Sequence, residues 1–301
     1  GGYSAESEGT AYFDDISVQE VDTLPDGVTA SLWYNYDYGV ADDTGTDDAD
    51  TPQKSTLLFV LLAIAFMILV AIGAGELLHE EPLEKPKANV TLLAFFLALA
   101  AAFVLRLVLG GKVLGYQVDM GCFAAWSLRM ADVGPLGFYA PDYFCDYPPG
   151  YMLLLWPVGL ILRAVGYTDT AGVRLLLKIV PILCDMAAAV VLFRYARKRI
   201  PLKAAAFVSL LFAVNPAALV NGAAWGQVDS VLALLMLFTA IAAMEKNWRA
   251  ALPLFIVAIL VKPQALLFAP VGVVWLALSL ATASRGERKA QWKGVWQGLA
   301  V

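Results

Sequence analysis

The chain has 301 residues, of which 60% are apolar and 16% are charged, and its mean hydropathy is +0.68. Soluble domains usually carry about 25% charged residues, so this composition argues against a soluble enzyme and predicts a polytopic membrane protein. The formal net charge of −5 and the lack of a basic block disfavour nucleic-acid binding. Three cysteines and one histidine, with no CxxC pair, exclude a structural zinc site.

The first 54 residues form a polar front end that holds 13 of the 26 acidic residues and a single base, Lys54. Residues 10–21 alternate between two faces, as a half-buried strand does. The string GTAYFDDISVQEV resembles the closing strand of a carbohydrate-binding β-sandwich, and any other secreted β-sandwich is an open alternative. We therefore expect residues 1–24 to be the last strand of a truncated extracellular β-sandwich. Residues 25–54 are expected to be an acidic, disordered tether.

Residues 55–301 are predicted to form an all-α transmembrane domain with about seven helices. An apolar stretch of about 20 residues is long enough to cross the hydrocarbon core of a bilayer. The last apolar stretch is too long for one helix and is interrupted by Lys262-Pro263-Gln264, so it is split into two spans. Because the chain starts with Gly-Gly and stops within an apolar stretch, we expect a fragment cut at both ends. The expected spans are 57–75, 91–109, 173–193, 204–224, 228–244 and two within 252–280.

Basic residues indicate the orientation of these helices, because cytoplasmic loops are enriched in Lys and Arg. If the acidic front end is outside, the inner loops hold 13 of the 21 bases, and segment 110–172 falls outside. Segment 151–165 is apolar but short and contains Arg163, so we expect a helix lying on the outer leaflet rather than a span. The predicted location is therefore a multi-pass cell-membrane protein with its N-terminus and segment 110–172 on the extracytoplasmic side.

The outer segment has the features of a binding site. Asp119, Phe123, Trp126 and Met130 recur at helical spacing, which predicts an amphipathic helix at the membrane surface. Residues 134–151 then contain six aromatics, four prolines and two acids. A stiff, aromatic, acidic loop suits sugar rings. The alternative, an interfacial aromatic belt, explains the aromatic residues but neither Asp119 nor the acid of the DYPP string.

Other polar residues are expected on the same outer face. The turn NGAAWGQVDS joins two spans, and Lys262 with Gln264 forms a second outer break. Asp185 lies within a predicted span, where ionisable residues are costly and are functional candidates. The structural alternative for Asp185 is a partnership with Lys178 or with a backbone donor.

Five strings occur in an order that resembles the GT-C glycosyltransferases. They are VDMGCFAAWSLRMADVGPLGFY, DYPPGY, ILCDMAAA, NPAALVNGAAWGQVDS and VKPQALLFAP, and the resemblance covers about residues 90–282. The chain is most similar to the bacterial membrane proteins that resemble the GPI mannosyltransferase adding the second mannose. It is also similar to the glucosyltransferases that use dolichol-phosphate glucose.

The resemblance implies transfer of a hexose, in the first place mannose, from a polyprenyl-phosphate sugar to a hydroxyl of a glycan, glycolipid or protein. Asp119 matches the catalytic base, and a single base with direct displacement implies inversion. Lys262, or alternatively Arg129, would stabilise the departing phosphate. The substrate-binding candidates are Asp146, Tyr147, Trp126, Tyr139, Arg129, Trp225, Gln227, Asp229, Lys262 and Gln264, and the supporting candidates are Asp185, Pro148 and Pro149.

Several alternatives stay open from the sequence. The outer loops contain no DxD pair, so no cofactor is expected, although a divalent metal is not excluded. A lipid-sugar transporter would also carry ionisable residues within spans, but it would typically show inverted repeats. A surface carbohydrate-binding anchor would account for the front end but not for the later spans. Cys122 and Cys145 share the outer segment and are candidates for a disulfide.

Overall fold

The structure is a computed structural model that describes Ile64, Met67 and residues 85–141, 143–166 and 170–300. The predicted β-strand, the predicted tether and most of the expected first span at 57–75 lie outside the described residues. Within the described part, the chain is helical and contains no strand.

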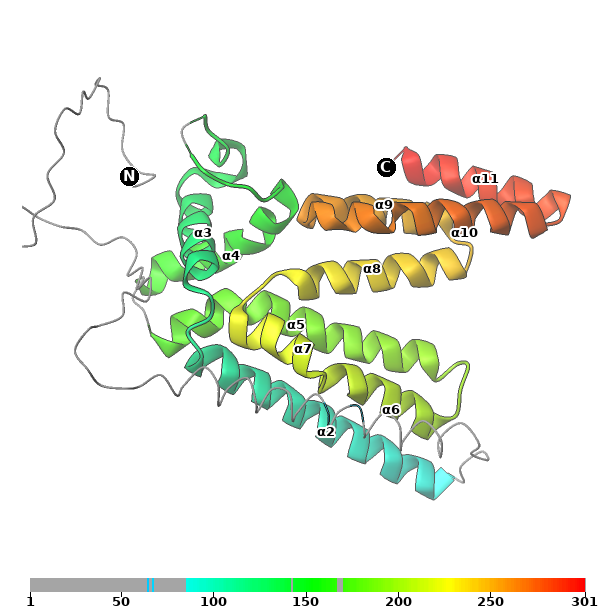
Figure 1. Cartoon of the computed structure of the whole chain (residues 1–301), viewed down its shortest axis with the longest axis horizontal. Coiled ribbons are helices and arrows are strands. Elements are labelled where there is room, and N and C mark those ends of the chain that lie inside the picture. Colours follow the sequence, from blue (N-terminus) through cyan, green and yellow to red (C-terminus); the bar gives the residue numbers. More distant parts are fainter. Residues whose placement is uncertain (1–63, 65–66, 68–84, 142, 167–169, 301) are drawn as a thin grey trace, which may run out of the picture.

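The helices form a bundle that is covered at one end by two crossing helices, α3 and α4 (Figure 1). Helices α5, α6, α8, α9, α10 and α11 run roughly side by side along the bundle, with α2 beside α5 and α6. The elements are α2 (Lys85–Lys112), α3 (Gln117–Gly137), α4 (Pro149–Val165), α5 (Ala171–Ala196), α6 (Leu202–Ala213), α7 (Pro216–Ala218), the π-helix η1 (Leu219–Trp225), α8 (Asp229–Met244), α9 (Trp248–Val261), the 3₁₀-helix η2 (Pro263–Phe268), α10 (Ala269–Thr282) and α11 (Arg285–Leu299).

Four described segments are long and apolar enough to cross a bilayer: Asn89–Lys112, Ala171–Ala196, Leu202–Trp225 and Pro263–Thr282. The described part of the chain therefore has the all-α architecture of a membrane protein, as predicted. Six of the seven expected spans fall within the described residues, and four of them match these segments, whereas the expected spans at 228–244 and in the first part of 252–280 do not. Helices α8 and α9 are apolar but have only 16 and 14 residues, below the roughly 20 that a straight crossing needs. Both helices end at polar turns. A hydropathy profile averages over neighbouring apolar residues and so does not show where these helices end.

The predicted break at Lys262 is confirmed, because α9 ends at Val261 and η2 begins at Pro263. Lys262 itself is extended, with φ −153° and ψ 120°. A residue before proline avoids the helical region because the proline ring clashes with its backbone. Segment 151–165 is also a helix, α4, and it packs against α3.

A second break, at Asn215-Pro216, explains a buried ion pair. The Asn215 side chain accepts a hydrogen bond from the Ala217 amide at 2.8 Å, so the Ala213 carbonyl loses its helical partner. Nη1 of Arg106 donates to that carbonyl at 2.6 Å, and Nε donates to Oδ2 of Asp185 at 3.2 Å. Both charged side chains are buried. The charged partner of Asp185 is thus Arg106, and of the two structural alternatives, Lys178 is not the partner of Asp185.

We expect Arg106→Met to destabilise the bundle by about 3 kcal/mol or more, because it leaves the carboxylate of Asp185 buried without its counter-charge. Thermal or denaturant unfolding of the purified protein in detergent would measure this loss. Adding Asp185→Asn to the same variant removes the uncompensated charge and should recover part of the stability. Wild-type stability of Arg106→Met would contradict the assigned role of the pair.

The two ends of the bundle differ in charge. The loops that join α5 to α6, α8 to α9 and α10 to α11 lie at the end opposite α3 and α4 (Figure 1). These loops and the adjoining helix ends contain basic side chains that the sequence assigned to one membrane face: Arg194, Arg197, Lys198, Arg199, Lys203, Lys246, Arg249, Arg285, Arg288, Lys289 and Lys293. The basic side chains of these three loops are therefore gathered at one end of the bundle.

Candidate functional site

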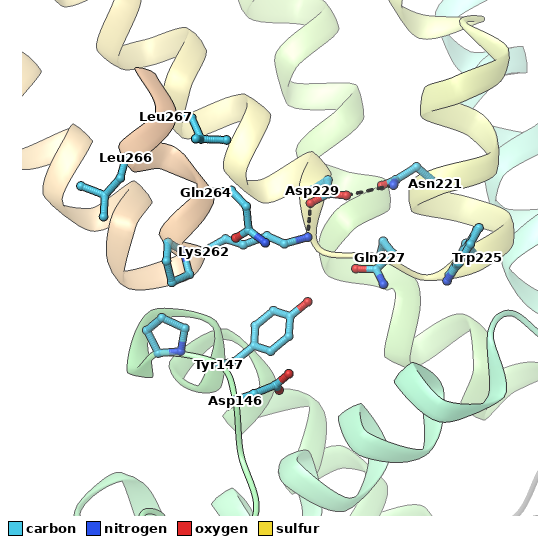
Figure 2. A pocket seen from close by; sticks show the side chains of 12 residues that line it. Asp146, Tyr147, Asn221, Trp225, Gln227, Asp229, Lys262, Gln264, Leu266 and Leu267 are labelled. Carbon is cyan, nitrogen blue, oxygen red and sulfur yellow. Dashed lines mark hydrogen bonds and ion pairs between the residues drawn. The ribbon is translucent and has the colours of Figure 1, made fainter. Parts of the chain in front are cut away.

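A pocket of about 790 Å³ opens between the loop that precedes α4 and the covered end of the bundle (Figure 2). Three segments that are distant in the sequence supply its walls: the α3–α4 loop, the turn from η1 to α8, and the turn from α9 into η2. The lining residues are Asp146, Tyr147, Pro148, Asn221, Trp225, Gln227, Asp229, Lys262, Pro263, Gln264, Leu266 and Leu267.

The turn between η1 and α8 carries most of the polar wall. Asn221 organises this turn, because its backbone carbonyl accepts hydrogen bonds from the backbone amides of Gly226 (3.1 Å) and Gln227 (2.9 Å). Nδ2 of Asn221 also donates to Oδ2 of Asp229 at 3.0 Å. One residue, Asn221, therefore holds both the backbone amides of the turn and the carboxylate of Asp229.

Lys262 faces this wall from the end of α9, and its ammonium pairs with Oδ1 of Asp229 (Figure 2). Only 13% of the Lys262 side chain is exposed, against 44% for Asp229. The extended backbone that Pro263 imposes lets the lysine leave the helix and reach across the pocket. A shielded positive charge therefore lies beside the opening, next to Gln264.

Asp119, in the first turn of α3, lies beside the pocket rather than in its lining. Its Oδ2 accepts hydrogen bonds from Nε1 of Trp225 (3.2 Å) and from Nε2 of Gln227. Oδ1 receives no hydrogen bond from the described residues. Burial raises the pKa of the Asp119 carboxyl, while the two hydrogen bonds and the charge of Lys262 act in the opposite direction. This carboxylate thus has one fixed oxygen and one available oxygen.

The α3–α4 loop places Asp146 and Tyr147 opposite the polar wall (Figure 2). The Tyr139 hydroxyl donates to the Tyr147 carbonyl at 2.9 Å and so fixes this part of the loop. Burial, reinforced by the nearby aspartates, raises the pKa of the Tyr147 phenol. Tyr147 therefore keeps its proton at neutral pH and can act as a hydrogen-bond donor.

Three of the predicted substrate-binding residues, Trp126, Arg129 and Tyr139, do not line the pocket. Trp126 is buried in the core, where its indole donates to the Phe144 carbonyl at 3.0 Å. Nε of Arg129 donates to the Phe138 carbonyl at 2.8 Å, and its guanidinium lies 4.1 Å from the centre of the Tyr143 ring. Both side chains, like that of Tyr139, brace the α3–α4 loop. The aromatic content of the outer segment could not separate these packing residues from pocket residues.

The remaining predicted residues divide between the pocket and its supports. Pro148 lines the pocket, whereas Pro149 starts α4. Asp185 belongs to the buried pair with Arg106. Leu266 and Leu267, which make the apolar wall, are not among the residues predicted from the sequence. Their position immediately after the Lys262 break was the signal that could have identified them.

The three cysteines are free thiols in the structure, including Cys122 and Cys145. Burial raises the pKa of Cys145 to about 11, so this thiol is protonated and poorly reactive at neutral pH. In the part of the chain that the structure describes, no three or more His, Cys, Asp or Glu side chains are grouped as metal ligands would be.

Comparison with known protein families, curated proteins and solved structures found no match for this chain. Function is therefore inferred from the chemistry of the pocket. An available carboxylate oxygen on Asp119 can accept a proton, and the ammonium of Lys262 can stabilise an anion. Tyr147, Gln227 and Asp229 offer donors and acceptors suited to a polyhydroxylated ligand.

Proposed function

We propose that this chain is part of a GT-C-type glycosyltransferase that transfers a hexose, in the first place mannose, from a polyprenyl phosphate to an acceptor hydroxyl. One observation carries the proposal. A hydrogen-bonded carboxylate, Asp119, lies beside a polar pocket, and a shielded ammonium, Lys262, lines the same pocket, although the two residues are 143 positions apart in the sequence. The order of the five sequence strings supports the same class of enzyme.

In the proposed reaction, Asp119 is the general base. The acceptor oxygen attacks the anomeric carbon as its proton moves to Oδ1, while Trp225 and Gln227 hold Oδ2 and thereby orient the carboxylate. A single base and a direct displacement give inversion at the anomeric carbon.

The bond from the anomeric carbon to the phosphate oxygen breaks in the same step, and the polyprenyl phosphate leaves with the electron pair. Lys262 stabilises the charge that develops on this phosphate, and the Tyr147 phenol donates a hydrogen bond from the opposite wall. Leu266 and Leu267 offer an apolar wall beside the charged region. The proposal needs no cofactor.

The positive-inside rule places the basic end of the bundle in the cytoplasm and the pocket on the extracytoplasmic side. There the sugar of a lipid-linked donor would meet a glycan, glycolipid or protein acceptor. Labelling of an introduced cysteine near position 119 with a membrane-impermeant maleimide in intact cells tests this placement. Labelling only after lysis would reject it.

The decisive assay incubates membranes that contain the protein with labelled polyprenyl-phospho-mannose or polyprenyl-phospho-glucose and an endogenous or added acceptor. Transfer of label from one donor, absent from membranes without the protein, would support the enzyme. Movement of intact lipid-linked sugar across the membrane without transfer would instead indicate a transporter. Parallel reactions with a chelator test the need for a divalent metal.

We expect the acid limb of the pH profile of kcat/KM to lie above the ordinary aspartate pKa, because burial raises the pKa of Asp119. The ionised base is then lost, and transfer falls, as the pH drops through that raised value. Asp146→Asn should move the limb to lower pH, since the negative charge of Asp146 also raises the pKa of Asp119. A limb that does not move in this variant would contradict the assignment of the titrating group.

A further inference from the structure

We propose that Lys178, a buried lysine of α5, is a positioning residue that fixes Asp119 against Trp225 and Gln227. The catalytic part of this inference rests on the proposed function, whereas the positioning itself does not. Lys178 contributes nothing to the lining of the pocket, and the proposed reaction does not use it.

Lys178 joins two turns by hydrogen bonds. Its side chain is completely buried, and Nζ donates to the carbonyls of Val113 at 2.7 Å and Ala224 at 2.8 Å. Val113 begins the connection from α2 to α3, and Ala224 lies in the last turn of η1. One ammonium therefore holds together segments that are more than 100 residues apart.

The two turns are shaped to fit this lysine. Gly115 and Gly226 have φ values of 85° and 94°, which residues with a Cβ rarely adopt. A Cβ added at either position would lie 3.3 Å from Cε of Lys178. It would also lie 2.5 Å from the Trp225 carbonyl oxygen at Gly115, or 2.6 Å from Sδ of Met120 at Gly226. Each glycine thus lets its turn approach both the lysine stem and the opposite turn.

The same two turns also contact each other directly. The Tyr116 amide donates to the Trp225 carbonyl at 3.3 Å, and the Tyr116 and Trp225 rings lie 5.6 Å apart. Asp119 follows Tyr116 in the first turn of α3, and Trp225 and Gln227 flank Gly226. The hydrogen bonds that orient Asp119 therefore depend on the relative position of the two turns that Lys178 joins.

Lys178→Met isolates this role, because methionine preserves most of the unbranched stem but removes the three N–H donors. The carbonyls of Val113 and Ala224 then lose their charged partner in a buried position. Leu177→Met is the matched control. Leu177 is the preceding residue of α5, is also buried, and differs little in volume from methionine.

Hydrogen–deuterium exchange of the full chain in detergent or nanodiscs tests the positioning without any assumption about activity. Lys178→Met should speed exchange in peptides covering 113–120 and 222–228 by at least about tenfold, because a charge-assisted hydrogen bond is worth about 1.5 kcal/mol or more. Exchange in α9 and α11 should stay unchanged, and Leu177→Met should leave both turns as in the wild type. Unaltered exchange in both turns of Lys178→Met would overturn the proposal.

The second readout separates positioning from general destabilisation. Asp119 is hydrogen-bonded to Trp225 and Gln227. The titratable groups that interact with it are Lys262, Asp146, Tyr147 and Cys122. Displacing Trp225 and Gln227 removes hydrogen bonds that lower its pKa, so the acid limb of kcat/KM should move to higher pH in Lys178→Met, with kcat reduced more than donor KM is raised. If hydrogen–deuterium exchange of the two turns rises in Lys178→Met but the acid limb of kcat/KM stays at the wild-type pH, Lys178 does not position Asp119. If the wild-type protein transfers no sugar, the proposed function fails, and the exchange result still decides the positioning.

Discussion

Asp119→Asn is expected to lower kcat for sugar transfer by about 10²- to 10⁴-fold, the contribution typical of a general base. Asparagine matches aspartate in size, and its Oδ1 can still accept hydrogen bonds from Trp225 and Gln227. The substitution therefore keeps the geometry beside the pocket and removes the proton acceptor. Transfer of labelled hexose by purified, correctly folded variant measures the effect.

Asp132→Asn is the matched control, because it makes the same chemical change on the same helix, away from the pocket. Asp132 is exposed and pairs with Arg163 of α4. Exposed pairs of this kind contribute little to stability, so this variant should retain transfer close to that of the wild type. Near-wild-type turnover of Asp119→Asn would sink the assignment of the base. A loss of activity shared by both variants would point to damage of α3 instead.

Lys262→Met should lower kcat/KM for the lipid-linked donor by about 10²-fold, because the shielded ammonium no longer stabilises the departing phosphate. The expected loss appears both in kcat and as a raised donor KM, while the acceptor KM changes little. Initial rates over a range of donor concentrations, at fixed acceptor concentration, measure kcat and the donor KM. An unchanged dependence on donor concentration would reject the role.

A second explanation is that Lys262 only neutralises Asp229, with which it pairs. The double variant Lys262→Met with Asp229→Asn distinguishes these roles, because it removes both charges of the pair. If Lys262 acts on the phosphate, the double variant stays as impaired as Lys262→Met. Recovery towards the activity of Asp229→Asn alone would instead show that the lysine serves the aspartate.

Much of the architecture follows from local sequence. Apolar stretches of about 20 residues predict the long helices, and the chemistry of proline predicts the break at Lys262, where the extended backbone confirms it. The helical spacing of Asp119, Phe123, Trp126 and Met130 likewise predicts α3. The number of spans fails because hydropathy responds to composition and does not show where a short helix such as α8 or α9 ends.

The sequence by itself therefore determined the class of protein, the break at Lys262 and the polar residues of the turns, since these depend on neighbours along the chain. Only the tertiary structure decided which polar residues meet. Trp225 and Gln227 bind a carboxylate 106 and 108 positions away, and the partner of Asp185 is Arg106, 79 positions away. Such pairings arise from helix packing, in which a buried charge or carbonyl is costly unless it is paired. No local pattern of residues specifies that partner.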